Sequence, residues 1–172
     1  LVRLPRQAPL WVAPALGLEA ADLQGYAVTD VVYSKVTGAT HVYLQQQYRG
    51  IPVYNAQLHI NVNRDGRVIS VNNSFLPGIA RAVSSLSPRM QLPAAVNSAA
   101  QFSGIAAPAQ LQALQTPRGV QQETSVPQAG MSLRPIAGKL MLLPIRQGEA
   151  RLVWNFQIHT LCVDRESRGL KI

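Results

Sequence analysis

The sequence predicts an α+β fold in which antiparallel sheets pack on one or two helices. Its first half alternates apolar and polar residues with a period of two in four successive segments. Turns of only a few residues separate these segments. One helix-favouring segment then precedes three further strand candidates. Because helices and strands do not alternate one by one, the pattern differs from that of an α/β protein.

The four early segments predict neighbouring strands of one sheet. We place these strands at Tyr26–Ser34, Thr40–Tyr48, Ile51–Asn63 and Arg67–Phe75. The connection at residues 63–66 reads Asn-Arg-Asp-Gly, which is typical of a hairpin turn. Since short connections join strands that lie side by side, an antiparallel meander is the expected topology.

The third strand has the clearest alternation in the chain. Every second residue is expected to point into a core: Tyr54, Ala56, Leu58, Ile60 and Val62. The residues between them are polar: Asn55, Gln57, His59 and Asn61. One buried and one polar face indicate an antiparallel sheet with one side open to water.

The second half is expected to hold one main helix and three strands. Pro93–Phe102 is rich in alanine, starts with a proline and precedes Gly104, which is a plausible C-terminal stop. We expect the sheet-facing residues to be Val96, Ala99, Ala100 and Phe102. The strands are predicted at Met131–Ala137, Lys139–Arg146 and Arg151–Thr160. Elsewhere, a short helix is expected over Pro14–Leu23 and a mobile loop near residues 115–130.

Composition excludes several classes of protein. The chain has 172 residues, 47% of them hydrophobic, and a net charge of +8. No apolar run is long enough to span a bilayer, so we expect no membrane partner. The single cysteine, Cys162, excludes an internal disulfide and a cysteine-rich zinc site. The basic residues are scattered and accompany no nucleic-acid-binding motif, so an acidic protein is a better partner than nucleic acid.

No catalytic motif accompanies these elements. The three histidines, His41, His59 and His159, lie in separate predicted strands, and the chain has no HExxH pair. It also has no GxSxG, P-loop or GxGxxG motif. We therefore expect no enzyme activity from this chain itself, no cofactor and no metal site.

One stretch of sequence resembles a known family. Residues 33–46 read YSKVTGATHVYLQQ, residues 50–58 read GIPVYNAQL and residues 61–75 read NVNRDGRVISVNNSF. Their order and spacing resemble the fungalysin/thermolysin propeptide motif, most closely as it occurs in fungalysin-type zinc metallopeptidases. The Ala-rich helix and the segment Leu152–Asn155 are similar, more loosely, to the PepSY-like part of such prodomains.

The resemblance implies a fold, a function and a partner. It implies a lead-in at residues 1–25, a propeptide-like subdomain at 26–80 and a PepSY-like, cystatin-like subdomain at 81–172 with a shortened tail. The implied function is a non-catalytic prodomain that assists folding of a secreted zinc metallopeptidase and inhibits it. The implied location is secreted or periplasmic, with any signal segment either removed or outside this sequence. The alternative is a stand-alone interaction module that binds another secreted or envelope protein.

The polar side of the predicted sheet is the candidate partner-binding surface. Polar side chains repeated along neighbouring strands can hydrogen-bond a partner without exposing a large apolar patch. The candidate contact residues are His41, Tyr43, Gln45, Asn55, Gln57 and His59. For each of them, the alternative is plain solvent exposure or a cross-strand hydrogen bond.

Overall fold

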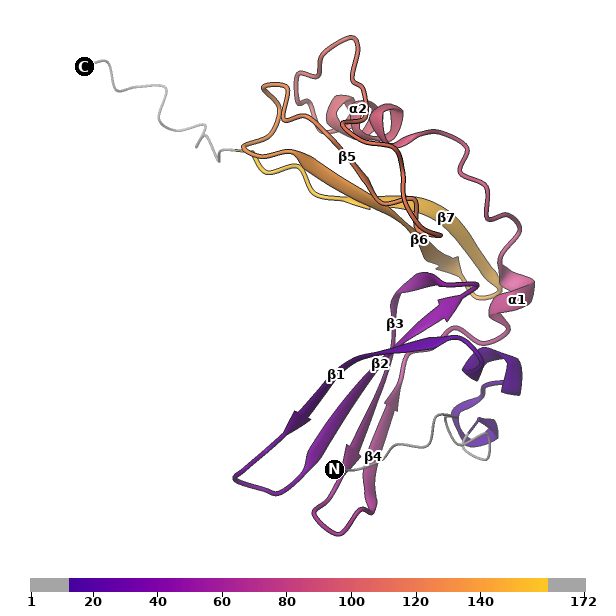
Figure 1. The fold of residues 1–172 in the computed structure, drawn as a ribbon. Coiled ribbons are helices and arrows are strands. Elements are labelled where there is room, and N and C mark those ends of the chain that lie inside the picture. The colour runs from indigo at the N-terminus through magenta and orange to yellow at the C-terminus, as the bar shows by residue number, and fades with distance from the viewer. Residues whose placement is uncertain (1–12, 161–172) are drawn as a thin grey trace. The chain divides into compact units, whose positions relative to one another are not determined.

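The computed structural model describes residues 13–160 and has an α+β fold (Figure 1). Hydrogen bonds link seven strands in the order β1-β2-β3-β6-β5, with β4 paired to β3 and β7 paired to β6. The chain divides into two compact units. Of the described residues, unit 1 contains 13–88 and 140–153, and unit 2 contains 89–139 and 154–160. The strands β6 and β7 therefore each contribute to both units.

Unit 1 contains the predicted antiparallel meander. Its strands are β1 (Tyr26–Tyr33), β2 (Thr40–Tyr48), β3 (Ile51–Val62) and β4 (Val68–Asn73), which agree with the predicted segments to within two residues at each end. Each strand pairs antiparallel with the next along the chain. The sequence encodes this arrangement locally, because period-two alternation and short turns leave little choice of pairing partner.

One face of this sheet forms a core with the residues that precede it. Val42, Leu44 and Leu58 are buried there against Leu18 and Leu23. The predicted helix over Pro14–Leu23 is replaced by two short 3-10 helices, η2 (Pro14–Leu16) and η3 (Ala20–Leu23). Gly17 separates them because its left-handed backbone, at φ 69°, ends the first turn.

The alternation along β3 breaks at Asn55. This residue has a left-handed backbone, with φ 54°. In the pairing with β2, Gln45 lies opposite Gln57 and Gln47 lies opposite Pro52, so residues 53–56 form an irregular excursion. The prediction that Tyr54 points into the core is therefore wrong: the side chain is 45% exposed, whereas Val53 is fully buried.

Unit 1 also contains a parallel strand pair. Val53 of β3 pairs in parallel with Leu142 of β6 (Ile136–Arg146), and both side chains are fully buried. A short helix, α1 (Ile79–Ala82), supplies Ile79 and Ala82 to the same core cluster. The sheet is therefore mixed, whereas the sequence predicted antiparallel sheets. The difference arises because β6, from a distant part of the chain, pairs with β3 in parallel.

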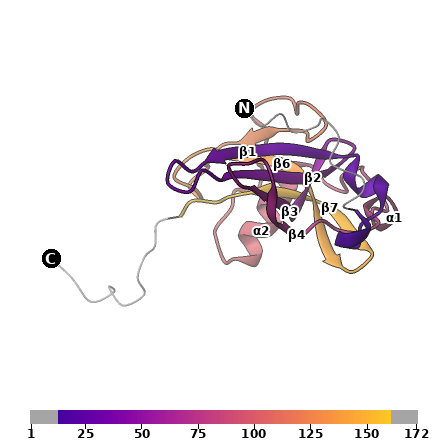
Figure 2. The same ribbon diagram turned by 90° about the horizontal axis from the view of Figure 1, so that it is seen from below.

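Unit 2 contains the predicted helix, α2 (Leu92–Phe102), which can be followed beside β6 and β7 in Figures 1 and 2. Leu92, Val96 and Ala100 are fully buried and lie one turn apart, which is the spacing of a single helix face. The helix ends at Phe102, and Gly104 follows with a left-handed backbone that lets the N–H of Ile105 donate to the carbonyl of Ala100 at 2.8 Å. Phe102 does not face the sheet as predicted and is 95% exposed.

The strands of unit 2 differ from the expected segments. The short strand β5 (Thr124–Val126) lies inside residues 115–130, for which a loop was predicted. The two strands predicted at 131–137 and 139–146 are replaced by the single strand β6, which runs through Gly138. The last strand, β7, spans Glu149–Phe156. Gly138 continues the strand because its missing side chain leaves room for Leu92 of α2.

Replacing Gly138 by alanine is expected to lower the free energy of unfolding by about 1–3 kcal/mol, because the new methyl group overlaps the side chain of Leu92. Urea unfolding followed by circular dichroism measures this loss. Ala137→Ser is the matched control: Ala137 is exposed, so a change of about 0.5 kcal/mol or less is expected. Equal stability of Gly138→Ala and the unchanged protein would contradict the close packing of α2 on β6.

Candidate protein-binding face

The polar side of β2, β3 and β4 carries most of the candidate residues in register. Tyr43 pairs with His59, and Gln45 pairs with Gln57. His41 pairs with Asn61, which extends the same set by one row. We call this surface the polar face, defined by His41, Tyr43, Gln45, Gln57, His59, Asn61 and Ser70.

A hydrogen-bonded row crosses three strands at one end of the polar face. Nδ1 of His41 lies 2.6 Å from Oδ1 of Asn61, and Nδ2 of Asn61 donates to Oγ of Ser70 at 2.7 Å. Since a carboxamide oxygen only accepts, Nδ1 of His41 carries the proton in this arrangement. The row holds the three side chains in fixed orientations while His41 and Asn61 remain half-buried and Ser70 exposed.

A second row combines aromatic and amide groups. The rings of Tyr43 and His59 meet edge to face, with their centroids 4.6 Å apart. Nε2 of His59 lies 3.2 Å from Oε1 of Gln57. Gln57 is exposed, and the two ring side chains are half-buried. This row therefore places two half-buried aromatic rings beside an accessible amide, a combination typical of protein-binding surfaces.

Gln45 and Asn55 stand apart from these rows. Nε2 of Gln45 donates to the carbonyl of Ala56 at 2.8 Å and also to that of Val53, so this amide holds the excursion of β3 in place. Asn55 lies in the excursion itself and is exposed. It lines an open cavity of about 380 Å³ together with Tyr54 and Pro144. Asn55 is therefore beside the polar face and not in its paired rows.

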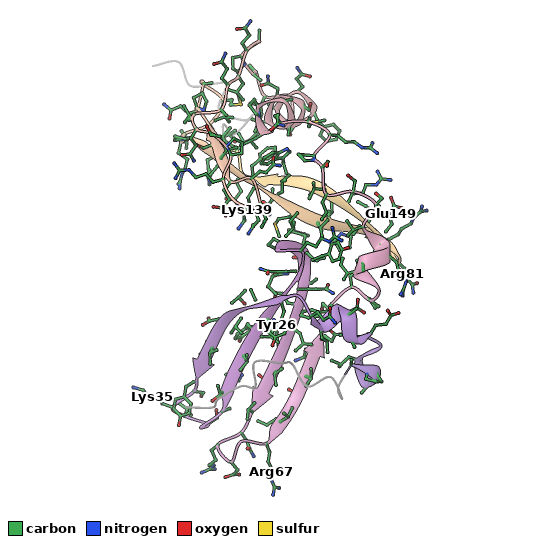
Figure 3. All side chains as sticks on the ribbon, turned by 45° about the vertical axis from the view of Figure 1, so that its right-hand side comes forward. Tyr26, Lys35, Arg67, Arg81, Lys139 and Glu149 are labelled. Carbon is green, nitrogen blue, oxygen red and sulfur yellow. The ribbon has the colours of Figure 1, made fainter. Side chains whose placement is uncertain are left out.

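Positive charge lies at one end of the same sheet. Lys35 belongs to the β1–β2 connection, and Arg64 and Arg67 belong to the β3–β4 connection, so all three lie at the same end of the meander (Figure 3). The acid among them is Asp65. In the described part of the chain, ion pairs occupy Arg81, Arg146 and Arg151 instead. The three hairpin cations therefore remain available to an acidic partner.

Among the described residues, two carboxylates form ion pairs, namely the exposed Glu19 and the half-buried Glu149. The hydrogen bond and the charge of Arg81 lower the pKa of Glu19. Hydrogen bonds from Arg151 and Arg146, together with their charges, lower the pKa of Glu149, which partial desolvation opposes. The arginines of all three pairs are exposed to solvent, so these pairs contribute little to the stability of the fold.

The other histidine and the cysteine lie elsewhere. His159 belongs to unit 2, while Cys162 lies outside the described residues. Over residues 13–160, no three side chains of His, Cys, Asp or Glu are grouped so that they would hold a metal ion. Within the same range, no helix is long and apolar enough to cross a bilayer.

Two residues of the polar face, Asn61 and Ser70, are not among the contact residues predicted from the sequence. Asn61 follows the same alternation as Gln57 and His59, so that alternation already indicated its side of the strand. Ser70 carried no such signal, because its position became clear only from the pairing of β4 with β3.

Comparison with known proteins finds a family that is similar to residues 24–75 of this chain. These residues match the family described as Fungalysin/Thermolysin Propeptide Motif. This range contains β1 to β4 and so the whole polar face.

Several fungal proteins are similar to the chain over this region. Extracellular metalloproteinase 10 of Coccidioides posadasii is 37% identical over 67 residues, which are 39% of this chain and 11% of that protein. Extracellular metalloproteinase 5 of Arthroderma otae is 36% identical over 55 residues, 32% of this chain and 9% of that protein. Extracellular metalloproteinase MEP of Neosartorya fischeri is 31% identical over 93 residues, 45% of this chain and 15% of that protein. The chain thus spans about a tenth of the length of such relatives.

Proposed function

We propose, from the fungalysin/thermolysin propeptide motif in residues 24–75, that the chain is a non-catalytic prodomain of a secreted fungalysin-type zinc metallopeptidase. In this role it binds the catalytic domain, assists its folding and holds it inactive. The single observation that carries the proposal is the motif, since the relatives that share it are extracellular metalloproteinases. The same names support a secreted location.

The proposed organisation keeps the two subdomains expected from the sequence. Residues 26–80 are proposed as the propeptide-like subdomain and residues 81–172 as a PepSY-like subdomain with a cystatin-like fold, although residues 140–153 of the latter pack within unit 1. The packing of α2 beside β5–β7 supports the PepSY-like assignment, because the fold expected for that subdomain is a helix packed on an antiparallel sheet.

The polar face is the proposed contact surface for the peptidase. Its side chains are held in fixed orientations by the His41–Asn61–Ser70 row and the Tyr43–His59 ring contact. Preorganised groups lose little conformational entropy on binding, so their contacts contribute more to affinity. A prodomain that binds the folded peptidase and not the unfolded one also stabilises it by mass action.

The test adds the chain to a secreted fungalysin-type peptidase from the same source and follows binding and proteolytic activity. Tight binding with loss of activity is the expected result, together with a higher yield of active peptidase when it refolds in the presence of the chain. Absence of both binding and inhibition at micromolar chain would instead favour the stand-alone interaction module.

The double variant Gln57→Ala/His59→Ala is expected to weaken inhibition about tenfold or more, because it removes the exposed amide and one of the two half-buried rings of this row. The inhibition constant measures the effect. Gln101→Ala/Gln128→Ala is the control, since both glutamines are exposed and belong to unit 2. An equal loss in the control variant would contradict the assignment of the contact to the polar face.

A further inference from the structure

A hollow in unit 2 has no role in the proposed function. It has a volume of about 550 Å³ and is lined by side chains from β5, β6, the end of β7 and the residues that flank these strands. The lining includes two basic side chains, Arg134 and Lys139, and the imidazole ring of His159. It also includes three side chains that carry a carboxamide: Gln115, Asn155 and Gln157.

The hollow lies on the side of β6 that α2 does not cover. Gly138 faces Leu92 of α2. Because side chains alternate along a strand, its neighbours Ala137 and Lys139 point to the opposite side, and both are exposed. Ser125 of β5 pairs with Ala137 and also lines the hollow. Figure 3 marks Lys139 on this strand.

Hydrogen bonds hold both walls of the hollow. On one side, the hydroxyl of Thr124 donates to the carbonyl of Gln115 at 2.7 Å, and the N–H of Leu114 donates to the carbonyl of Ser125 at 2.8 Å. The opposite wall is held at His159. Its carbonyl accepts from the N–H of Leu133 at 2.8 Å, and its N–H donates to Oγ of Ser132 at 3.2 Å.

The lining of the hollow carries more basic than acidic side chains. Within the described residues, Arg134 and Lys139 take part in no ion pair, and both are exposed. The acid of the lining is Glu123. A guanidinium binds a carboxylate through two parallel hydrogen bonds, and an ammonium adds a point charge. The carboxamides beside them have donors and acceptors that match peptide groups.

We propose that this hollow binds an acidic peptide segment of a protein partner, with its carboxylates on Arg134 and Lys139 and its backbone along the carboxamides. Charge complementarity carries the choice of occupant. Nucleic acid is a poorer fit, because Phe156 is the aromatic side chain of the lining and single-stranded nucleic acids bind through repeated base stacking. The proposal stands apart from the polar face and does not depend on the identity of the peptidase.

The test uses the full chain and a short fluorescein-labelled peptide of alternating Glu and Ser, followed by fluorescence anisotropy at low ionic strength. Saturable binding is expected, and the corresponding Gln and Ser peptide is expected not to bind. The variant Arg134→Gln/Lys139→Gln is expected to lose at least about tenfold in affinity, as for two charge-assisted contacts. Circular dichroism confirms that this variant is folded.

Arg49→Gln/Arg146→Gln is the control with the same change of net charge, because both arginines are exposed, belong to unit 1 and do not line the hollow. It is expected to bind the acidic peptide within about twofold of the unchanged chain, since screened distant charges contribute little. The proposal is overturned by no binding of the peptide or by an equal loss in the control. Displacement of the peptide by an equimolar single-stranded oligonucleotide would also overturn it. Because the peptide replaces the partner, these outcomes are independent of the peptidase experiment.

Discussion

Replacing Asp22 by alanine is expected to lower the free energy of unfolding by about 3 kcal/mol, which is the cost of leaving buried N–H groups without acceptors. Asp22 is 2% exposed. Its Oδ2 accepts from the N–H of Gly78 at 3.0 Å and its Oδ1 accepts from the N–H of Ile79 at 3.1 Å. The N–H of Glu19 also donates to Oδ2, at 2.9 Å. One carboxylate thus ties η3 to the start of α1 within unit 1.

Urea unfolding of the full chain, followed by circular dichroism, measures this loss. Asp22→Asn keeps one accepting oxygen, so its loss of stability is expected to be smaller than that of Asp22→Ala. Glu19→Gln is the control from the same turn. The Glu19 side chain is exposed and pairs with Arg81, so the unfolding midpoint of this variant is expected to change little. Unchanged stability of Asp22→Ala would contradict the anchoring role of the carboxylate.

Replacing Gln46 by alanine is expected to cost about 2–4 kcal/mol, because it removes two buried hydrogen bonds and leaves a cavity. Gln46 is fully buried on the core side of β2. Its Nε2 donates to the carbonyl of Leu76 at 3.0 Å, and its Oε1 accepts from the N–H of the same residue at 2.8 Å. This amide therefore satisfies the backbone of the segment between β4 and α1.

Two further variants separate the hydrogen bonds from the cavity. Gln46→Leu fills most of the space but leaves both backbone groups of Leu76 unpaired, so a loss of about 1–3 kcal/mol is expected to remain. Gln57→Ala is the control, because this glutamine lies on the neighbouring strand and is exposed. Full recovery of stability in Gln46→Leu would show that the cavity alone explains the cost of Gln46→Ala.

The four strands of unit 1 and their faces were largely predictable from local sequence. Val42, Leu44 and Leu58 alternate with Tyr43, Gln57 and His59, and this alternation places each set on its own side of the sheet. The turn at residues 63–66 was equally clear, since Oδ1 of Asn63 accepts from the N–H of Asp65 and of Arg67. Most of the polar face follows from these two local signals.

The sequence by itself determined the α+β class, the meander, the helix α2 and the propeptide-like motif, because each depends on residues close together along the chain. The tertiary structure alone decided the excursion at Asn55, the parallel pairing of Val53 with Leu142 and the passage of β6 through Gly138. These features depend on contacts between distant segments. The hydrogen bond from Gln45 to the carbonyl of Ala56 leaves no periodic signal in the sequence, and neither does the contact of Leu92 with Gly138. In both cases the two residues come together only when the chain packs.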